Sequence, residues 1–196
     1  MLSRGLRVEG AVEFGTEQVG DRRGVTVSTY REDVFTAAVG HPLFPVAQAA
    51  TTRSRKGVVR GIHYQPPTAK YVYCVRGKSL DIVVDTRVGS PTFGRWDSVM
   101  LDDRHFRALY LPAGVGHLSI ALAGETTLTR LTSTPYDDDT AAALSPLDAG
   151  LDLPIPRGLT LVLAERDQSA PTLAQALAAG LLPDYASCRA DDLTSS

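Results

Sequence analysis

The 196-residue chain has only two cysteines, Cys74 and Cys188, and they lie far apart and outside any CxxC spacing. That pattern argues against a disulfide framework or a zinc knuckle, and it fits a reducing, cytoplasmic setting. The chain also lacks any run approaching the roughly 20 apolar residues that a spanning helix needs. Its first residues, MLSRGLRVEGAVEF, contain no apolar stretch of signal-peptide length. We therefore expect a soluble protein that is neither secreted nor bound to a membrane.

An excess of charge of one sign is missing as well. The chain has 20 Lys and Arg against 22 Asp and Glu, a formal net charge of −2 and a pI near 6.1. Without a broad basic surface, nucleic acids and anionic membranes are disfavoured as partners. Only three of the 20 basic residues are lysine. That bias is typical of GC-rich genomes and is compatible with a specialised metabolic pathway.

What the chain does have is a succession of short segments rich in β-branched and aromatic residues. They cover residues 24–30, 45–52, 56–64, 70–77, 79–87, 93–101, 106–112, 117–122 and 126–134. Turn-forming stretches separate them at intervals of about 8 to 14 residues, the rhythm of a β-sandwich or barrel. The fold class predicted is all-β, in one domain over residues 1–185.

One helix is expected near the end, in PTLAQALAAGLLP. Thr172 and Gln175 have capping-box spacing, and Gly180 followed by Pro183 would end the helix. Residues 186–196 are polar and are expected to form a frayed tail.

Histidine spacing speaks against a metal site. Metal-binding cupins resemble one another in an HxH motif with a following glutamate and in a later PxGxxH motif. This chain has the second, ending at His117, but reads His63-Tyr64-Gln65 at the first. Two histidines do not supply the three or four converging ligands that a divalent metal needs, so we expect no metal and no other cofactor.

Longer motifs carry a more specific resemblance. RGIHYQPP, KYVYCVRGKSLDIVVDTRVGSPTFGRW, LYLPAGVGH, SPLDAGLDLPIP and APTLAQALAAGLLPDY follow one another in order. Together they resemble the dTDP-4-dehydrorhamnose 3,5-epimerase family over nearly the whole chain. The resemblance implies a jelly-roll cupin without metal, usually a homodimer. It also implies a small-molecule substrate, a dTDP-4-keto-6-deoxy sugar, epimerised at C3, C5 or both in deoxysugar or antibiotic biosynthesis.

Inverting a carbon beside a ketone needs a base, a positive group for the enolate oxygen, and an acid on the opposite face. By resemblance, His63 is the base, Asp148 the carboxylate that orients it, and Lys70 the cation at the keto oxygen. The resemblance also implies a substrate-binding group of four residues: Arg60 near the pyrophosphate, Gln48, His117 and Arg23. A structural alternative stays open for His117 as a core histidine. Asp81 and Asp85 are interpreted as a solvated strand face.

The chain departs from the family at the acid. Where the family has YLxSxxY, this chain reads RLTSTPY, so Arg130 replaces the tyrosine that acts as general acid and Tyr136 keeps the other tyrosine. A guanidinium with a pKa above about 12 is a poor proton donor. Arg130 could point into solvent at a slipped register, with Tyr136 or water returning the proton. Alternatively, the base and cations serve an isomerase, cyclase or dehydratase-like enzyme on another carbonyl compound, or the protein only binds its ligand.

Overall fold

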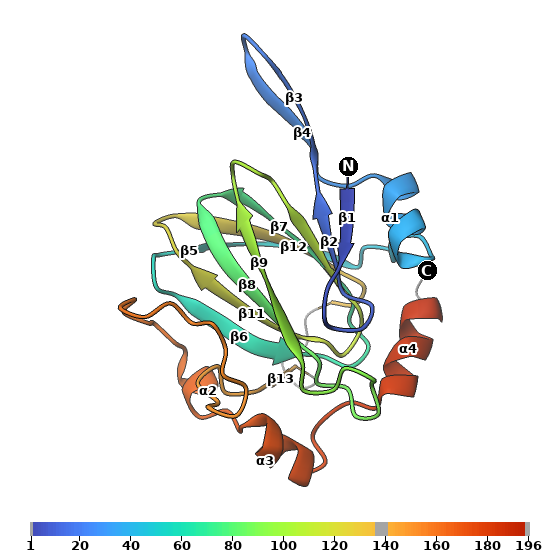
Figure 1. The fold of residues 1–196 in the computed structure, drawn as a ribbon, viewed down its shortest axis with the longest axis vertical. Coiled ribbons are helices and arrows are strands. Elements are labelled where there is room, and N and C mark those ends of the chain that lie inside the picture. The colour runs from blue at the N-terminus through green and yellow to red at the C-terminus, as the bar shows by residue number, and fades with distance from the viewer. Residues whose placement is uncertain (1, 136–140, 195–196) are drawn as a thin grey trace.

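A computed structural model describes residues 2–135 and 141–194, and within them two antiparallel sheets face each other (Figure 1). The six-stranded sheet has the order β1-β2-β10-β7-β12-β5, and the five-stranded sheet has the order β13-β6-β11-β8-β9. The strands of the first sheet are β1 (Leu2–Gly5), β2 (Val12–Gly15), β10 (Ala108–Leu111), β7 (Lys70–Arg76), β12 (Thr126–Thr132) and β5 (Gln48–Ser54). Those of the second are β13 (Ala142–Ala143), β6 (Val59–Tyr64), β11 (Gly116–Ala121), β8 (Lys78–Val84) and β9 (Trp96–Asp102). The predicted all-β core is confirmed.

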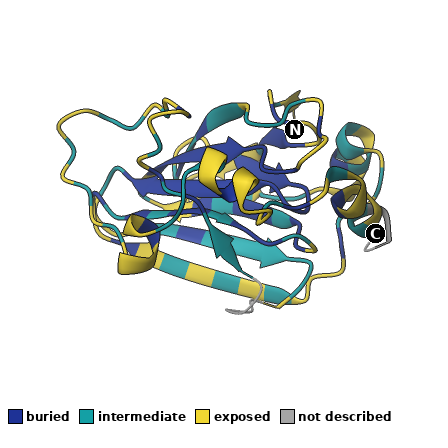
Figure 2. Cartoon of the chain, turned by 90° about the horizontal axis from the view of Figure 1, so that it is seen from below, coloured by how far each residue is buried: buried dark blue, intermediate teal, exposed yellow. Residues whose placement is uncertain are grey.

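Apolar side chains fill three layers around these sheets. Between the sheets, Val72 and Leu109 from one sheet pack with Val83 and Leu101 from the other. A second cluster lies on the outer face of the five-stranded sheet, under the chain from Leu144 to Leu182. Each fully buried side chain of this kind contributes about 1.5–3 kcal/mol. Strands in the middle of the molecule are dark blue in Figure 2, which shows that they are buried.

The third layer covers the outer face of the six-stranded sheet. Helix α1 (Glu32–Val39), which the sequence pattern did not predict, places Phe35 against Phe14 with ring centroids 5.5 Å apart. Phe35 also meets Tyr110 edge to face, at 5.0 Å. Aromatic packing of this kind closes the sheet on the side away from the second sheet.

A two-stranded hairpin extends away from the body (Figure 1). It consists of β3 (Glu17–Asp21) and β4 (Gly24–Ser28), paired only with each other. The strand expected over residues 24–30 therefore exists, but it lies outside the two main sheets. Val19 and Val25 on this hairpin are 66% and 59% exposed, which leaves two apolar side chains without cover in one chain.

Three helices follow the last strand: α2 (Glu165–Gln168), α3 (Leu173–Ala178) and α4 (Tyr185–Thr194). The capping box of α3 is confirmed, because the Thr172 side chain accepts from the Gln175 amide and the Gln175 side chain accepts from the Thr172 amide. Among the described residues, no helix combines the length and apolarity required to cross a membrane.

The expected frayed tail is wrong for residues 186–194, which are helical in α4. Cys188 is 1% exposed, and Tyr185 stacks 5.0 Å from the guanidinium carbon of Arg87. Asp192 accepts a 2.9 Å hydrogen bond from the Ala113 amide. A polar sequence therefore forms a docked helix because a few side chains contact the body at helical spacing.

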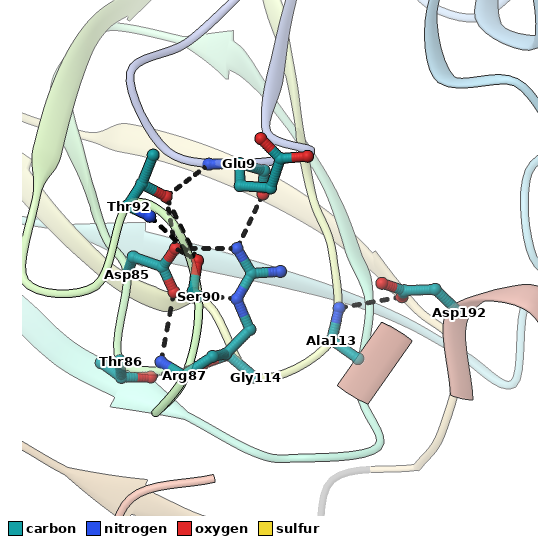
Figure 3. Close-up of polar contacts among 9 residues, drawn as sticks. All are labelled: Glu9, Asp85, Thr86, Arg87, Ser90, Thr92, Ala113, Gly114 and Asp192. Atoms are coloured by element: carbon teal, nitrogen blue, oxygen red, sulfur yellow. Dashed lines mark hydrogen bonds and ion pairs between the residues drawn. The ribbon is translucent and has the colours of Figure 1, made fainter. Parts of the chain in front are cut away.

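The solvated interpretation of Asp85 is also wrong, since this side chain is fully buried. Figure 3 shows the Asp85 carboxylate among Arg87, Ser90 and Thr92, each of which donates to it. Burial raises the pKa of Asp85, but these hydrogen bonds outweigh it and hold the pKa below its ordinary value. The Thr86 hydroxyl donates to the Gly114 carbonyl, so this network also holds the turn that precedes β11.

Candidate active site

A cavity of about 390 Å³ lies between the two sheets. One wall comes from β6 and β11 and the other from β5, β7 and β12. The described residues that line it are Gln48, Ala50, Arg60, His63, Tyr64, Gln65, Thr68, Lys70, His117, Arg130, Thr132, Thr134 and Ala141. Six of the predicted site residues are therefore together, and the described lining contains three cationic side chains and no carboxylate.

His63 is held by a carboxylate from a distant part of the chain. Its Nε2 lies 2.7 Å from Oδ1 of Asp167 in α2, which is 2% exposed. The other carboxylate oxygen of Asp167 accepts from the Gly61 amide at 3.4 Å. Because a carboxylate accepts, Nε2 carries the proton and Nδ1 keeps the lone pair that can take a proton from a ligand.

The predicted pairing of His63 with Asp148 is wrong. The Asp148 carboxylate instead accepts from the amides of Leu173 and Gly150, both at 2.8 Å. It therefore ties the first turn of α3 to the loop before it. Asp148 was assigned to His63 by the resemblance of its SPLDAG motif, whereas the carboxylate that meets His63 is that of Asp167 in α2.

The environment of His63 favours the neutral base. Burial lowers the pKa of His63, the hydrogen bond and charge of Asp167 raise it, and the charges of Lys70 and Arg166 lower it again, leaving it below the ordinary value. At neutral pH the imidazole is therefore uncharged. A neutral imidazole with an oriented lone pair is the state that a general base requires.

A second histidine–aspartate pair lies beside the first. His117 is the cross-strand partner of His63, and its Nε2 lies 2.8 Å from Oδ1 of Asp81. His117 lines the cavity and Asp81 is fully buried, so the solvated interpretation of Asp81 is wrong. Burial lowers the pKa of His117 more than Asp81 raises it. Both imidazoles thus belong to the wall formed by the five-stranded sheet.

The opposite wall contributes two of the three cationic side chains, Lys70 and Arg130. Arg130 pairs in register with Ala50 and Val72 and lines the cavity. The alternative in which a slipped register turns Arg130 into solvent is therefore wrong. Lys70 reaches across the cavity to donate to the His63 carbonyl at 3.3 Å. Burial, helped by the charge of Arg130, lowers the pKa of Lys70 to about 8.

The remaining predicted residues differ in position. Arg60 lines the cavity, where its Nε donates to the Ser54 hydroxyl at 3.2 Å. Arg23 does not: it lies on the β3–β4 hairpin, exposed and paired with Asp21. Tyr136 lies outside the described residues.

The donor set suits proton transfer better than metal binding. In the described parts of the chain, no group of three or more His, Cys, Asp or Glu side chains could hold a metal ion. Each cavity histidine already shares one ring nitrogen with a carboxylate. The arrangement is instead an oriented base that faces cations across a cavity large enough for a sugar.

Comparisons with known proteins identify the family of the chain. The family model of dTDP-4-dehydrorhamnose 3,5-epimerase matches residues 5–175. The chain belongs to this family. It is 49% identical to a dTDP-4-dehydrorhamnose 3-epimerase of Streptomyces niveus, over 97% of this chain and 92% of that protein. It is 43% identical to a dTDP-4-dehydrorhamnose 3,5-epimerase of Mycolicibacterium smegmatis, over 97% and 94%.

Solved structures confirm the jelly-roll cupin fold of the family. One is NovW, a 4-keto-6-deoxy sugar epimerase from the novobiocin gene cluster of Streptomyces spheroides, with a TM-score of 0.91, 49% identity and coverage of 96% and 95%. Another is ChmJ, a 3'-monoepimerase from Streptomyces bikiniensis in complex with dTDP-quinovose, with a TM-score of 0.91, 41% identity and coverage of 97% of both chains. The family's relatives are isomerases that act on dTDP-sugars, at one carbon or two.

Sequence reasoning missed the two carboxylates that hold the histidines, Asp167 and Asp81. Within LVLAERDQ, nothing local separates Asp167, 2% exposed, from the exposed Glu165. Asp81 had a signal: it stands in the apolar run SLDIVVD, where both faces of the strand are buried. A charged residue in such a strand is expected only with a partner, and here the partner is His117.

Proposed function

We propose that this protein is an epimerase of dTDP-4-keto-6-deoxyhexoses, acting at C3, C5 or both, in deoxysugar or antibiotic biosynthesis. One observation carries the proposal: the His63–Asp167 pair faces Lys70 and Arg130 across a cavity of about 390 Å³. The relatives named above act on such substrates, which supports the same substrate class here.

In this mechanism, Nδ1 of His63 removes the proton from the carbon next to the ketone. Asp167 stabilises the imidazolium that results, because its carboxylate holds the Nε2 proton. The ammonium of Lys70 and the guanidinium of Arg130 stabilise the enolate oxygen. Loss of one such donor costs about 3–4 kcal/mol of transition-state stabilisation in other enzymes. A proton returned to the opposite face completes the inversion.

The dTDP end of the substrate needs cations at the cavity mouth. Arg60, placed on β6 beside the site, serves the pyrophosphate, while Gln48 and His117 contact the rest of the ligand. Arg23 is not among the described residues that line its own cavity, and its hairpin extends away from the two main sheets (Figure 1), so in this proposal it serves the substrate of another copy of the chain.

A homodimer fits the surfaces left uncovered in one chain. Strand β5 is an edge of its sheet, and Val19 and Val25 are exposed on the hairpin. Unpaired edges and exposed apolar pairs are surfaces that a second copy covers. Both cysteines are free thiols, which suits a reducing, cytoplasmic location.

One observation favours a second function. Arg130 lines the cavity in place of a tyrosine and has no readily transferable proton. Enolate formation without return of the proton to the opposite face would give an isomerase, cyclase or dehydratase-like enzyme on another carbonyl compound.

Proton NMR of dTDP-4-keto-6-deoxyglucose with the protein in D₂O tests the proposal, with exchange and configuration followed separately at C3 and C5. Exchange with inversion at either carbon is expected. The His63→Ala variant should show neither, because the base is removed. Absence of any exchange with the unaltered protein would refute the epimerase and direct the search to another carbonyl substrate or a binding role.

A further inference from the structure

A second cavity, of about 200 Å³, has no described lining residue in common with the active-site cavity. It lies where α4 meets the C-terminal end of α1, the loop before β2 and strand β10. Tyr185, Arg189 and Asp192 line it from α4, at positions i, i+4 and i+7. Residues with this spacing share one face of a helix, so α4 forms one wall of the cavity.

Two buried hydrogen-bond donors in the lining have no partner. Tyr110 is 1% exposed, yet its hydroxyl makes no hydrogen bond to any residue that the structure describes. Arg87 is 2% exposed; its Nε and Nη2 donate to Asp85, and Nη2 also donates to the Glu9 carbonyl at 2.7 Å. Its Nη1 donates to none of the residues drawn in Figure 3, nor to any other described residue. An unpaired buried donor costs about 1–3 kcal/mol, so both groups call for an acceptor inside the cavity.

The charges around the cavity favour a neutral occupant. The positive charge of Arg87 is met by Asp85. Glu9 and Arg189, which have opposite signs, are both exposed. The carboxylate of Asp192 would repel an anion, and the guanidinium of Arg87 would repel a cation.

Asp192 offers an acceptor beside these donors. Its Oδ1 accepts from the Ala113 amide at 2.9 Å, and a carboxylate has capacity for several hydrogen bonds. The charge of Arg87 lowers the pKa of both Asp192 and Tyr110, and the charge of Asp192 raises that of Tyr110. The three groups therefore act on one another across the same small space. The Tyr185 ring and Pro112 add flat apolar surface to it.

We propose that this cavity is a second binding site, for a small, neutral, planar molecule with a carbonyl oxygen beside an N–H group. This is the chemistry of an amide or a cyclic imide, such as the edge of a pyrimidine base. The carbonyl oxygen accepts from Nη1 of Arg87 and the Tyr110 hydroxyl, and the N–H group donates to Asp192. The cavity has room for one such ring, or for about six or seven water molecules at roughly 30 Å³ each.

Fluorine NMR with 5-fluorouracil as the probe tests the site on the full chain. We expect saturable binding that is about 2- to 10-fold weaker in Tyr110→Phe, which loses one hydrogen bond but keeps the ring that packs 5.0 Å from Phe35. Ala38→Leu should abolish binding, because its side chain extends into the cavity from α1. His63→Ala is the matched control in the other cavity and should bind the probe as the unaltered protein does.

Three results of this experiment would overturn the proposal. Without any binding of 5-fluorouracil, the cavity holds water only. If Tyr110→Phe binds the probe as tightly as the unaltered protein, the hydroxyl is not a contact. If fluoroacetate, a small anion, binds there more tightly than 5-fluorouracil, the site selects an anion instead.

Carbon NMR of labelled tyrosine side chains locates the bound probe. The chain has seven tyrosines, and Tyr110→Phe assigns the signal of Tyr110. The signals of Tyr110 and Tyr185 should move when 5-fluorouracil binds, while that of Tyr64, which lines the active-site cavity, should stay. Movement of Tyr64 without Tyr110 would place the probe in the active site and overturn the proposal. Neither measurement uses a sugar substrate, so both stand apart from the test of the epimerase.

Discussion

At the scale of single residues, the base of the site depends on a carboxylate that is remote in sequence. Asp167→Asn should lower kcat by about 100- to 10,000-fold, because an amide does not hold the imidazole in the right tautomer or stabilise its charged form. Asp148→Asn is the matched control and should leave kcat unchanged, since its side chain contacts only backbone amides near α3. Steady-state rates of both variants decide the point. A loss of activity in Asp148→Asn but not in Asp167→Asn would restore the pairing predicted from sequence.

Arg130 distinguishes the two candidate functions. If the protein is an epimerase, Arg130→Tyr should leave the inversion rate intact or raise it. An increase should not exceed the 100- to 10,000-fold that a general acid contributes. If the cavity serves another carbonyl substrate, the same change should abolish that activity. Initial rates of inversion, measured by NMR, give the answer. Arg53→Tyr is the surface control, because Arg53 lies exposed on the adjacent β5 and pairs with Glu125.

Sequence predicted the cavity residues better than their pairings. His63, Lys70, Arg60, Gln48, His117 and Arg130 were predicted from the resemblance to the family, and all six line the cavity. Asp167 was missed because a hydrogen bond across 104 positions leaves no local pattern, and Asp81 because its place in an apolar strand was interpreted as a solvated face. Which carboxylate meets which histidine is decided by the packing of α2 and β8.

At the scale of elements, β6 and β11 approach each other so closely that only glycine fits at position 61. Gly61 has φ +120°, and a Cβ there would lie 2.2 Å from the His117 carbonyl oxygen. Gly61→Ala should therefore lower the free energy of unfolding by about 2–4 kcal/mol, measured by urea denaturation. Gly124→Ala is the control, since a Cβ there meets nothing within 4 Å. Equal stability of the two variants would show that β6 can shift without cost.

The stability that α4 gains by docking depends on pH, because Asp192 on this helix is buried. Burial raises the pKa of Asp192 from its ordinary 3.8 to about 6, against the lowering effects of the Ala113 amide and of Arg87 and His41. The folded protein therefore binds this proton more tightly than the unfolded chain. The resulting stabilisation is complete below about pH 4 and is lost as the pH rises through about 6.

Asp192→Asn should remove this loss while keeping an oxygen for the Ala113 amide. At pH 7 the free energy of unfolding of the Asp192→Asn variant should exceed that of the unaltered protein by up to about 2 kcal/mol. This difference should vanish near pH 4. Urea unfolding at several pH values measures the difference. A variant that is less stable at pH 7 would mean that the charge of Asp192 holds α4 in place.

Most strands were predictable because they are short, apolar and separated by turn residues. The exceptions have physical causes. The hairpin was taken for part of the sheet because Val25 and Val27 have the composition of core strands, yet Val25 is 59% exposed. Helix α4 was missed because its polar sequence needs Arg87 and Ala113, distant in the chain, to dock against.

At the scale of the whole molecule, each chain has a cavity between its two sheets and a hairpin that extends away from those sheets (Figure 1). We predict a dimer of twice the 21.0 kDa chain mass by light scattering after size-exclusion chromatography. Replacing Val19 and Val25 together by Asp should give monomers, because the hairpin would carry charge into the contact. Leu147→Asp, at a residue that is 59% exposed on a loop, should remain dimeric.

If Arg23 contributes to the cavity of the partner subunit, two inactive variants should restore activity when they form a mixed dimer. His63→Ala and Arg23→Ala should each lose activity alone, because one lacks the base and the other a contact to the phosphate groups. When the two are mixed and allowed to exchange subunits, a heterodimer has one cavity with both residues intact. With random exchange, half of the dimers are mixed and have one complete site in two, so about a quarter of the original activity should return. If activity does not return although native mass spectrometry shows mixed dimers, Arg23 does not act across the interface and is not a residue of the partner's active site.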